Sequence, residues 1–327
     1  MKISGDMINL KIRFNGKIKG MFMNLLFSGE TILRVTRSLA KTVLKRNTSQ
    51  RLNCAEVFIE KKSGGKVRTR IYKSLHHEEN AVGLLWIHGG GYAIGAPEMD
   101  VGYIEKLIAA TNCVIVSPDY TLSTEKPYPA ALEDCYEALI WLKENAASLG
   151  VRSDQIFVCG VSAGGGLTAA VTLMARDKGE VNIAFQMPIY PMIDDRMNTE
   201  SAINNNAPIW NSKSNTLGWK MYLNELFGQD NVPKYAAPAR ETDYSGLPPA
   251  YTFVGDIEPF YNETITYFDN LKNTGITAKV DVYKGCYHAF EIMCPKADIS
   301  KQAVNRVLEE FKYAAENYYA EQNICES

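Results

Sequence analysis

Histidine is scarce in this sequence. Four histidines occur among 327 residues, at positions 76, 77, 88 and 288, so any chemistry that needs an imidazole base must use one of them. Cysteine is more frequent, but the seven cysteines are scattered and include no C-x-x-C pair. This pattern excludes zinc ribbons and thioredoxin-like redox motifs, and it fits a reducing, cytoplasmic setting.

Long apolar runs and a large charge excess are also missing. No apolar run reaches the length that a membrane-spanning helix needs, about 18 residues or more. The lysines before the apolar patch at 21–27 are followed by Glu30 and a basic stretch without a small-residue cleavage site, so we expect no signal peptide. The net charge of −2 lacks the basic footprint of a nucleic-acid-binding protein, and we expect no nucleic-acid partner.

The composition is that of an ordinary globular protein, and short apolar segments typical of strands alternate with segments of helical periodicity. We expect strands at 54–60, 67–72, 84–87, 114–117, 156–159, 183–187, 251–254 and 278–283. We expect helices at 132–149, 163–175, 263–271 and 303–318. This alternation predicts an α/β fold with a mostly parallel sheet flanked by helices. Periodicity is lost between 194 and 240, which indicates an insertion.

Basic residues are concentrated at the start of the chain. Residues 1–50 contain ten basic and two acidic residues, a net charge of +8. Within them Ile32, Val35, Leu39 and Val43 recur at helical spacing among arginines and lysines. We expect this amphipathic helix to dock on the main domain through its apolar stripe. A helix lying on a membrane surface and a mobile arm are the alternatives.

The strongest chemical signal is residues 160–164, Gly-Val-Ser-Ala-Gly, a G-x-S-x-G motif between an expected strand and an expected helix. The glycines remove side chains that would clash when the serine is held at the tip of a sharp turn. The N-terminus of the helix favours negative charge that develops beside the serine. The pattern predicts Ser162 as a nucleophile; a serine that only caps the helix is the alternative.

A second signal, His-Gly-Gly-Gly-Tyr at 88–92, directly follows an expected strand. Three glycines allow backbone N–H groups to face a developing oxyanion. A plain flexible turn and a phosphate-binding loop are the alternatives, but neither G-x-G-x-x-G nor G-K-[ST] spacing is present. We interpret His88 as a packed histidine that stabilises the loop.

The third signal is His288, which follows the last expected strand, at the edge of the sheet where ligand sites gather. His76 and His77 lie in a polar loop, where we expect them to be solvated, so His288 is the expected base. A carboxylate that orients its imidazole should lie between the serine and the histidine in the chain. The loop after the strand at 251–254 offers Asp256 and Glu258, and Asp256 could instead cap the next helix.

The chain resembles the hormone-sensitive-lipase-like family of serine esterases, which have the α/β-hydrolase fold. The similar segments cover about residues 80–315 in order, and some have no catalytic duty. They are HGGGY at 88–92, SPDYTLSTEKPYPAALED at 117–134, GVSAGGG at 160–166, YPMIDDR at 190–196, SGLPPA at 245–250, and His288 with Phe290. The resemblance implies a catalytic domain over residues 51–327. It also implies a helical cap built from N-terminal helices in residues 1–50 and the insertion at about 194–240.

Two positions depart from the family pattern. The family's acid motif, Asp-Pro-Leu-x-Asp-Glu, is matched by Glu-Pro-Phe-Tyr-Asn-Glu at 258–263, so the resemblance assigns the acid to Glu258 and not to Asp256. Val161 precedes the serine where the family usually has an acidic residue, and we expect this change to tune activity without abolishing it.

The resemblance implies hydrolysis of short- to medium-chain acyl esters without a cofactor or a metal. Ser162 would attack the acyl carbon and His288, oriented by the acid, would take the serine's proton. The N–H groups of Gly90, Gly91 and Ala163 would hold the oxyanion. Amidase, peptidase or lactonase use of the same residues is the nearest alternative, and a non-catalytic ligand-binding member of the fold is a more distant one. A small-molecule ester is the expected partner, and a homo-oligomer is left open.

Overall fold

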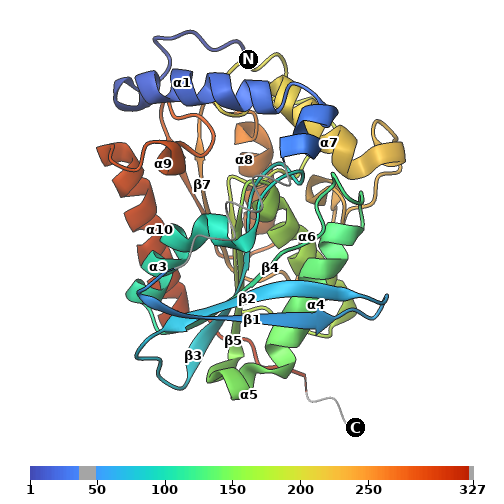
Figure 1. Cartoon of the computed structure of the whole chain (residues 1–327), viewed down its shortest axis with the longest axis vertical. Helices are drawn as coiled ribbons and strands as arrows, with labels where there is room; N and C mark the ends of the chain where they lie inside the picture. Colours follow the sequence, from blue (N-terminus) through green and yellow to red (C-terminus); the bar gives the residue numbers. More distant parts are fainter. Residues whose placement is uncertain (37–48, 324–327) are drawn as a thin grey trace.

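The computed structural model describes residues 1–36 and 49–323. Its strands are β1 (Leu52–Glu60), β2 (Lys66–Ser74), β3 (Ala81–Ile87), β4 (Cys113–Pro118), β5 (Val151–Val161), β6 (Phe185–Ile189), β7 (Ala250–Gly255) and β8 (Ala278–Tyr283). They form one sheet in the order β1-β2-β4-β3-β5-β6-β7-β8 (Figure 1). The β1–β2 and β2–β4 pairs are antiparallel and the other pairs are parallel. The predicted mostly parallel sheet is confirmed.

Helices cover both faces of the sheet. They are α1 (Leu10–Leu26), α3 (Val101–Ala110), α4 (Ala130–Glu144), α5 (Ala146–Leu149), α6 (Ala163–Lys178), α7 (Ser212–Leu223), α8 (Tyr261–Asn273), α9 (Phe290–Met293) and α10 (Asp298–Asn317). Buried residues of α3 and α10 share one core cluster, while those of α4 and α6 belong to another and α8 packs with α6. The result is three layers with the sheet in the middle.

The central strand β3 explains why these layers form. All seven of its residues are buried, as expected for a parallel strand covered on both faces. Successive side chains point to opposite faces. Leu84 and Trp86 therefore pack in the core beside α3 and α10, whereas Leu85 and Ile87 pack in the core beside α4 and α6.

Several predicted elements have different boundaries in the structure, and two of the differences have a clear physical reason. The helix expected at 132–149 is divided at Asn145 into α4 and α5, and Gly150 closes it in the left-handed conformation (φ 71°). The strand expected to stop before Pro188 continues through it to Ile189. Proline is tolerated there because β6 pairs with β7 at only one register position, so the missing N–H removes little of the ladder.

The N-terminal helices differ most from the prediction. The resemblance implied helices within residues 1–50, but periodicity did not locate α1, because its apolar residues lie on two opposite faces and give no single stripe. The helical segment 30–36 docks through Leu33, which is fully buried against the core cluster of α4 and α6. The prediction that the helix docks through Ile32 and Val35 is wrong, since both side chains are exposed. Leu39 and Val43 lie outside the described residues.

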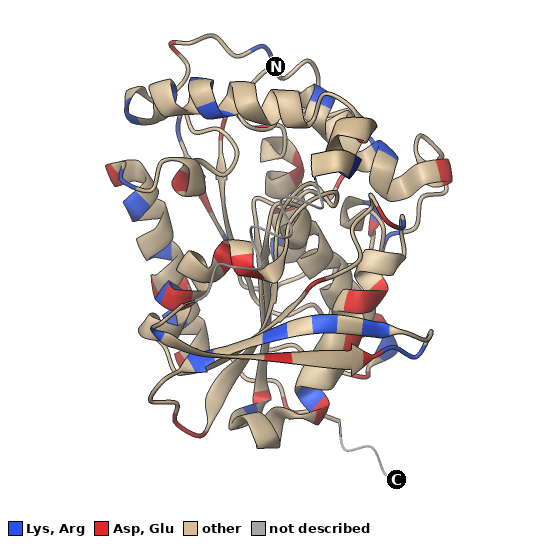
Figure 2. Ribbon diagram, viewed as in Figure 1, with Lys and Arg blue, Asp and Glu red and all other residues tan. Residues whose placement is uncertain are grey.

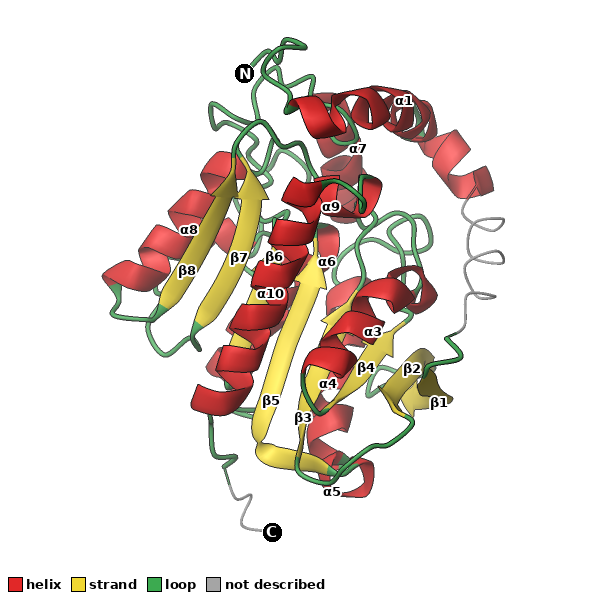
Figure 3. Ribbon diagram, turned by 90° about the vertical axis from the view of Figure 1, so that its left-hand side faces the viewer, coloured by secondary structure: helices red, strands yellow, loops and turns green. Residues whose placement is uncertain are grey.

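The carboxyl ends of the parallel strands lie at one edge of the sheet, and α1 and α7 lie beyond that edge (Figures 1 and 3). Loops from β3, β5, β7 and β8 meet there, so the motifs predicted to carry chemistry are brought to one place. Within the described ranges, no helix is long and apolar enough to cross a membrane.

Candidate active site

Ser162 is at the sharp turn between β5 and α6. Its backbone has φ 59° and ψ −120°, a strained conformation for a residue with a side chain. The turn is held because the Ser162 N–H donates to the carbonyl of Ile189 (2.9 Å) and its carbonyl accepts from the N–H of Gly166 (2.9 Å). Its hydroxyl makes no capping hydrogen bond to α6. The alternative that Ser162 only caps the helix is therefore wrong.

The two glycines of the motif are required by close backbone contacts. A side chain at Gly160 would collide with the carbonyl of Gly164, and one at Gly164 would collide with the carbonyls of Ile87 and His88. Strand β3 and helix α6 can approach this closely only when both positions lack a Cβ. The spacing of the motif thus follows from the packing of the turn against β3.

The structure brings the three predicted site residues together. The Ser162 Oγ–H donates to Nε2 of His288 at 2.8 Å, and Nδ1–H of His288 donates to Oε2 of Glu258. Glu258 is fully buried, and His288 and Ser162 are 4% and 8% exposed. The second oxygen of Glu258 accepts from the N–H of Gly255 at 2.9 Å, so both carboxylate oxygens are engaged. The arrangement can move a proton from the hydroxyl to the imidazole and stabilise the cation formed.

Asp256, the competing carboxylate, has a different contact. Its Oδ1 accepts from the backbone N–H of Gly285 at 2.6 Å. Helix α8 begins only at Tyr261 and receives no side-chain cap, so the prediction that Asp256 caps this helix is wrong. Asp256 instead ties the loop after β7 to the loop after β8.

The glycine loop after β3 lies beside the serine. A Cβ placed on Gly89 would be 3.4 Å from Cβ of Ser162. Gly90 and Gly91 have positive φ values of 117° and 60°, which a residue with a side chain adopts at a cost. Ala163 is the first residue of α6, where backbone N–H groups have no acceptor within the helix. All three predicted oxyanion donors therefore belong to backbone segments adjoining Ser162.

His88 is fully buried and supports this loop. Its Nδ1 lies 2.8 Å from the carbonyl oxygen of Gly89, and its ring stacks on Tyr120 at 4.2 Å. The interpretation of His88 as a packed histidine is confirmed. His77 is half-buried and bonds to the carbonyl of Leu149, so the expectation that it is solvated is only partly right.

Three aromatic rings surround His288, and sequence reasoning did not assign them a place at its imidazole. Tyr190 and Phe260 meet the imidazole edge-on at 4.8 and 5.0 Å, and Trp210 lies 6.3 Å away. The only available signal was that Tyr190 and Phe260 fall inside segments similar to the family. These rings exclude water from the imidazole, which strengthens its hydrogen bonds to the serine and the glutamate.

A buried acid lies behind Tyr190. The hydroxyl of Tyr190 donates to Oε1 of Glu291, a residue of α9. Burial raises the pKa of Glu291 to about 7, and the Tyr190 hydrogen bond opposes this only in part. This carboxyl group was not predicted from the sequence, because nothing in its local pattern distinguishes it from a surface glutamate.

The insertion supports the loop that carries Glu258. The hydroxyl of Ser201 donates to the carbonyl of Pro259 at 2.8 Å, and Nδ2 of Asn205 donates to the carbonyl of Ile257 at 3.0 Å. These bonds hold the backbone on both sides of the glutamate. Ser201 and Asn205 therefore help to orient the carboxylate.

Helix α1 packs on the loop that carries His288. The hydroxyl of Tyr287 donates to the carbonyl of Ile12 at 3.2 Å, and the N–H of Asn9 donates to the carbonyl of Gly285 at 2.9 Å. A side chain at Gly16 would collide with the ring of Tyr287. The N-terminal segment thus approaches within van der Waals contact of a residue adjacent to His288.

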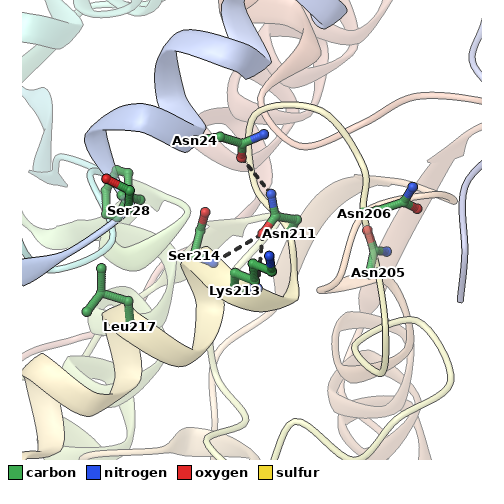
Figure 4. A pocket seen from close by; sticks show the side chains of 9 residues that line it. Asn24, Ser28, Asn205, Asn206, Asn211, Lys213, Ser214 and Leu217 are labelled. Carbon is green, nitrogen blue, oxygen red and sulfur yellow. Dashed lines mark hydrogen bonds between the residues drawn. The ribbon is translucent and has the colours of Figure 1, made fainter.

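A cavity of about 540 Å³ lies between α1 and α7 (Figure 4). Its walls combine asparagine, serine and lysine side chains with the apolar side chains of Phe27 and Leu217. Nδ2 of Asn211 donates to Oδ1 of Asn24 across the cavity at 2.6 Å. Phe27, which also lines the cavity, meets Trp210 edge-on at 4.8 Å. Because Trp210 is one of the three aromatic neighbours of His288, a chain of ring contacts connects the cavity with the reactive side chains.

Within residues 1–36 and 49–323, no group of three or more histidine, cysteine, aspartate or glutamate side chains is arranged to hold a metal ion.

The fold and this edge of the sheet define an α/β hydrolase. Residues 84–292 match a family model described as alpha/beta hydrolase fold. The esterase LipI of Mycobacterium tuberculosis is 32% identical over 247 residues, covering 75% of this chain and 77% of that protein. An arylesterase of Saccharolobus solfataricus is 28% identical over 229 residues, covering 68% of this chain and 72% of that protein.

The solved structure of a bacterial heroin esterase superimposes with a TM-score of 0.86 at 28% identity, covering 96% of this chain and 99% of that one. The chain belongs to the hormone-sensitive-lipase-like family of α/β hydrolases.

Proposed function

We propose that this carboxylesterase cleaves short- to medium-chain acyl esters with Ser162 as nucleophile, His288 as base and Glu258 as the acid that orients the base. The observation that carries the proposal is the buried series of hydrogen bonds from the serine hydroxyl through the imidazole to the carboxylate. The names of relatives and structural neighbours, which include esterase, arylesterase and heroin esterase, support ester bonds as the target.

The reaction proceeds through an acyl-enzyme. Oγ of Ser162 forms a bond to the acyl carbon while its proton passes to Nε2 of His288. The carbon–oxygen bond to the leaving alcohol then breaks, and His288 returns the proton to that alcohol. A water molecule, deprotonated by His288, attacks the acyl carbon and releases the acid together with the free serine. Glu258 stabilises the imidazolium formed in both halves.

Backbone N–H groups of Gly90, Gly91 and Ala163 hold the negative oxygen of the tetrahedral intermediate. Removal of one such donor by mutation in an acyl-transfer enzyme costs about 3–4 kcal/mol of transition-state stabilisation. The strained turn at Ser162 and the positive φ values of both glycines support this role, because they fix the backbone before the charge develops.

The substrate is a small-molecule ester, and residues 1–50 with the insertion at about 194–240 act as a cap over it. The cavity between α1 and α7 has a volume typical of small-ligand sites. The apolar side chains of Phe27 and Leu217 in its wall, next to the aromatic ring of Trp210, suit a short apolar acyl chain. Val161 is buried at the end of β5, where it packs without changing the charge near Ser162.

A screen of p-nitrophenyl esters from acetate to laurate tests the proposal, with p-nitroacetanilide as the amide control. We expect turnover that is highest for acyl chains of about two to eight carbons. Hydrolysis of the amide at a rate equal to that of the acetate ester would overturn the ester assignment. A maximum at laurate would overturn the assigned chain length.

A further inference from the structure

Helix α1 carries a second apolar face that points away from the protein. Its inward face is narrow: Ile12, Gly16 and Gly20 are its buried residues. Figure 1 shows α1 as the outermost helix at the end of the molecule beyond the strand edge, with only the loop that precedes it farther out. Six large apolar side chains of this helix are between 54% and 77% exposed: Leu10, Phe14, Ile18, Met21, Phe22 and Leu25.

These six side chains form one continuous stripe, which we call the outer face of α1. At 100° per residue they fall within an arc of about 120°, centred opposite the buried residues. The exposed Ile32 and Val35 add further apolar surface in the next helical segment. Monomeric proteins rarely leave so many neighbouring large apolar side chains in water, so this face has a partner.

The charge of α1 indicates which partner it is. Leu10–Leu26 contains four basic residues and no acidic residue. Lys11 and Lys17 are exposed, and on the helical projection they lie at or near the two borders of the outer face. In Figure 2, α1 carries the blue of lysine and arginine and none of the red of aspartate and glutamate. A stripe of Phe, Leu, Ile and Met bordered by lysines is the pattern of a helix that lies in a lipid–water interface.

Charge complementarity favours a lipid surface over a second copy of the chain. Two copies joined through this face would bring lysines of like charge together without an acidic residue of either α1 to balance them. Anionic headgroups instead neutralise the lysines while the acyl region receives the apolar side chains. We propose that the outer face of α1 docks the protein on anionic phospholipid bilayers, lying parallel to the surface.

The docked orientation follows from the position of the helix. The inward side of α1 contacts Tyr287, next to His288, and its last turn contributes Asn24 to the cavity. A membrane bound to the opposite side of α1 therefore lies close to the cavity without covering the sheet. Binding by this face does not depend on the proposed hydrolytic reaction.

Flotation of the full chain with vesicles tests the proposal. Vesicles of phosphatidylcholine with about 30 mol% phosphatidylserine are compared with phosphatidylcholine alone, at low salt and at about 0.5 M salt. We expect flotation with the anionic vesicles at low salt and about tenfold less bound protein at high salt or without phosphatidylserine. Equal binding to both vesicles, or none, would overturn the proposal.

Paired substitutions locate the surface. Phe14→Ser with Phe22→Ser should reduce bound protein about tenfold, whereas Phe58→Ser with Val282→Ser, at exposed apolar positions of β1 and β8, should not. Loss of binding in the second pair alone would place the surface elsewhere and overturn the proposal.

A double substitution of two lysines tests the electrostatic contribution to vesicle binding independently. Lys11→Gln with Lys17→Gln should weaken binding to the anionic vesicles, whereas Lys106→Gln with Lys312→Gln, at exposed lysines of α3 and α10, should leave it unchanged. All of these positions are exposed, so circular dichroism and hydrolysis of p-nitrophenyl acetate should match the unmodified protein.

Two further measurements separate the other outcomes. If the protein does not float but is a dimer that Phe14→Ser with Phe22→Ser converts to monomer, the outer face binds a second copy and the proposal is wrong. Ser162→Ala should float as the unmodified protein does. If the unmodified protein floats but hydrolyses none of the p-nitrophenyl esters, the proposed reaction is overturned and the lipid surface stands.

Discussion

Glu258 and His288 are joined by a hydrogen bond inside the protein, although thirty residues separate them in the chain. The carboxylate comes from the loop after β7 and the imidazole from the loop after β8. Because β7 and β8 are parallel neighbours, both loops leave the sheet at the same edge. Asp256 helps to hold the two loops together, because its carboxylate accepts a hydrogen bond from the backbone N–H of Gly285. Glu258 thus binds the imidazole of the loop after β8, and Asp256 binds the backbone of the same loop.

Removal of the nucleophile is the first prediction. Ser162→Ala should lower kcat for p-nitrophenyl butyrate about 10⁶-fold, because no other group supplies the attacking oxygen. Mass spectrometry after treatment with an organophosphate should find the label on Ser162 in the unmodified protein and no label in the variant. A variant that keeps a tenth of the activity would disprove the mechanism.

The second prediction distinguishes the two carboxylates. Glu258→Gln keeps the shape of the side chain but removes the charge that stabilises the imidazolium, and kcat should fall about 10⁴-fold. Asp256→Asn, the matched control, should leave kcat nearly unchanged and lower the free energy of unfolding by about 1–2 kcal/mol through a weaker bond to Gly285. The opposite ranking of the two kcat values would assign the acid to Asp256.

Filling the cavity is the third test. Leu217 lines it on α7, and Leu217→Trp should raise KM for p-nitrophenyl hexanoate about tenfold while changing KM for the acetate less than twofold. Lys220→Trp, at an exposed position on the same helix, should change neither constant. Equal effects on both esters would show that the cavity does not receive the substrate.

The fourth prediction concerns the pH dependence of stability. The pKa of Glu291 is raised from 4.5 to about 7 in the folded protein, so folding favours its protonated form. The contribution of the Glu291 carboxyl group to the free energy of unfolding is therefore fully present below about pH 4.5 and is lost as the pH rises through 7.

Glu291→Gln should remove this loss, so the variant gains free energy of unfolding relative to the unmodified protein between about pH 4.5 and 7.5. The gain should be on the order of 3 kcal/mol. Urea unfolding at several pH values measures the difference. Glu316→Gln, at an exposed residue of α10, is the control and should show no such trend. A difference for Glu291→Gln that is constant with pH would contradict the expected role of burial.

Much of the core architecture could be predicted because its causes are local. The run at 84–87 is apolar at every position, which a strand covered on both faces requires, and β3 is such a strand. The glycines around Ser162 are needed for a turn of five residues, so a short motif was sufficient to locate it. His288 followed by elimination, since the chain has only four histidines.

Other features depend on contacts between distant segments. Asp256 and Glu258 have the same charge and lie two residues apart, so only the direction in which the loop turns decides which of them meets the imidazole. Tyr190 and Trp210 contact His288 from two other parts of the chain, and no local sequence pattern predicts these contacts.

The sequence by itself determined the alternating α/β layers, the strained serine turn, the glycine loop and the choice of histidine, because each depends on neighbouring residues or on composition. The family resemblance assigned the acid to Glu258, although the local residues alone left Asp256 as an alternative. Only the tertiary structure decided that Leu33 and not Ile32 or Val35 is buried, and that α1 exposes a second apolar face. When a helix has apolar residues on two opposite faces, its sequence does not indicate which face is buried. The side that becomes buried is the one where Gly16 allows close approach to Tyr287, a residue more than 250 positions away, and Gly20 allows close approach to the backbone of Pro208 and Ile209.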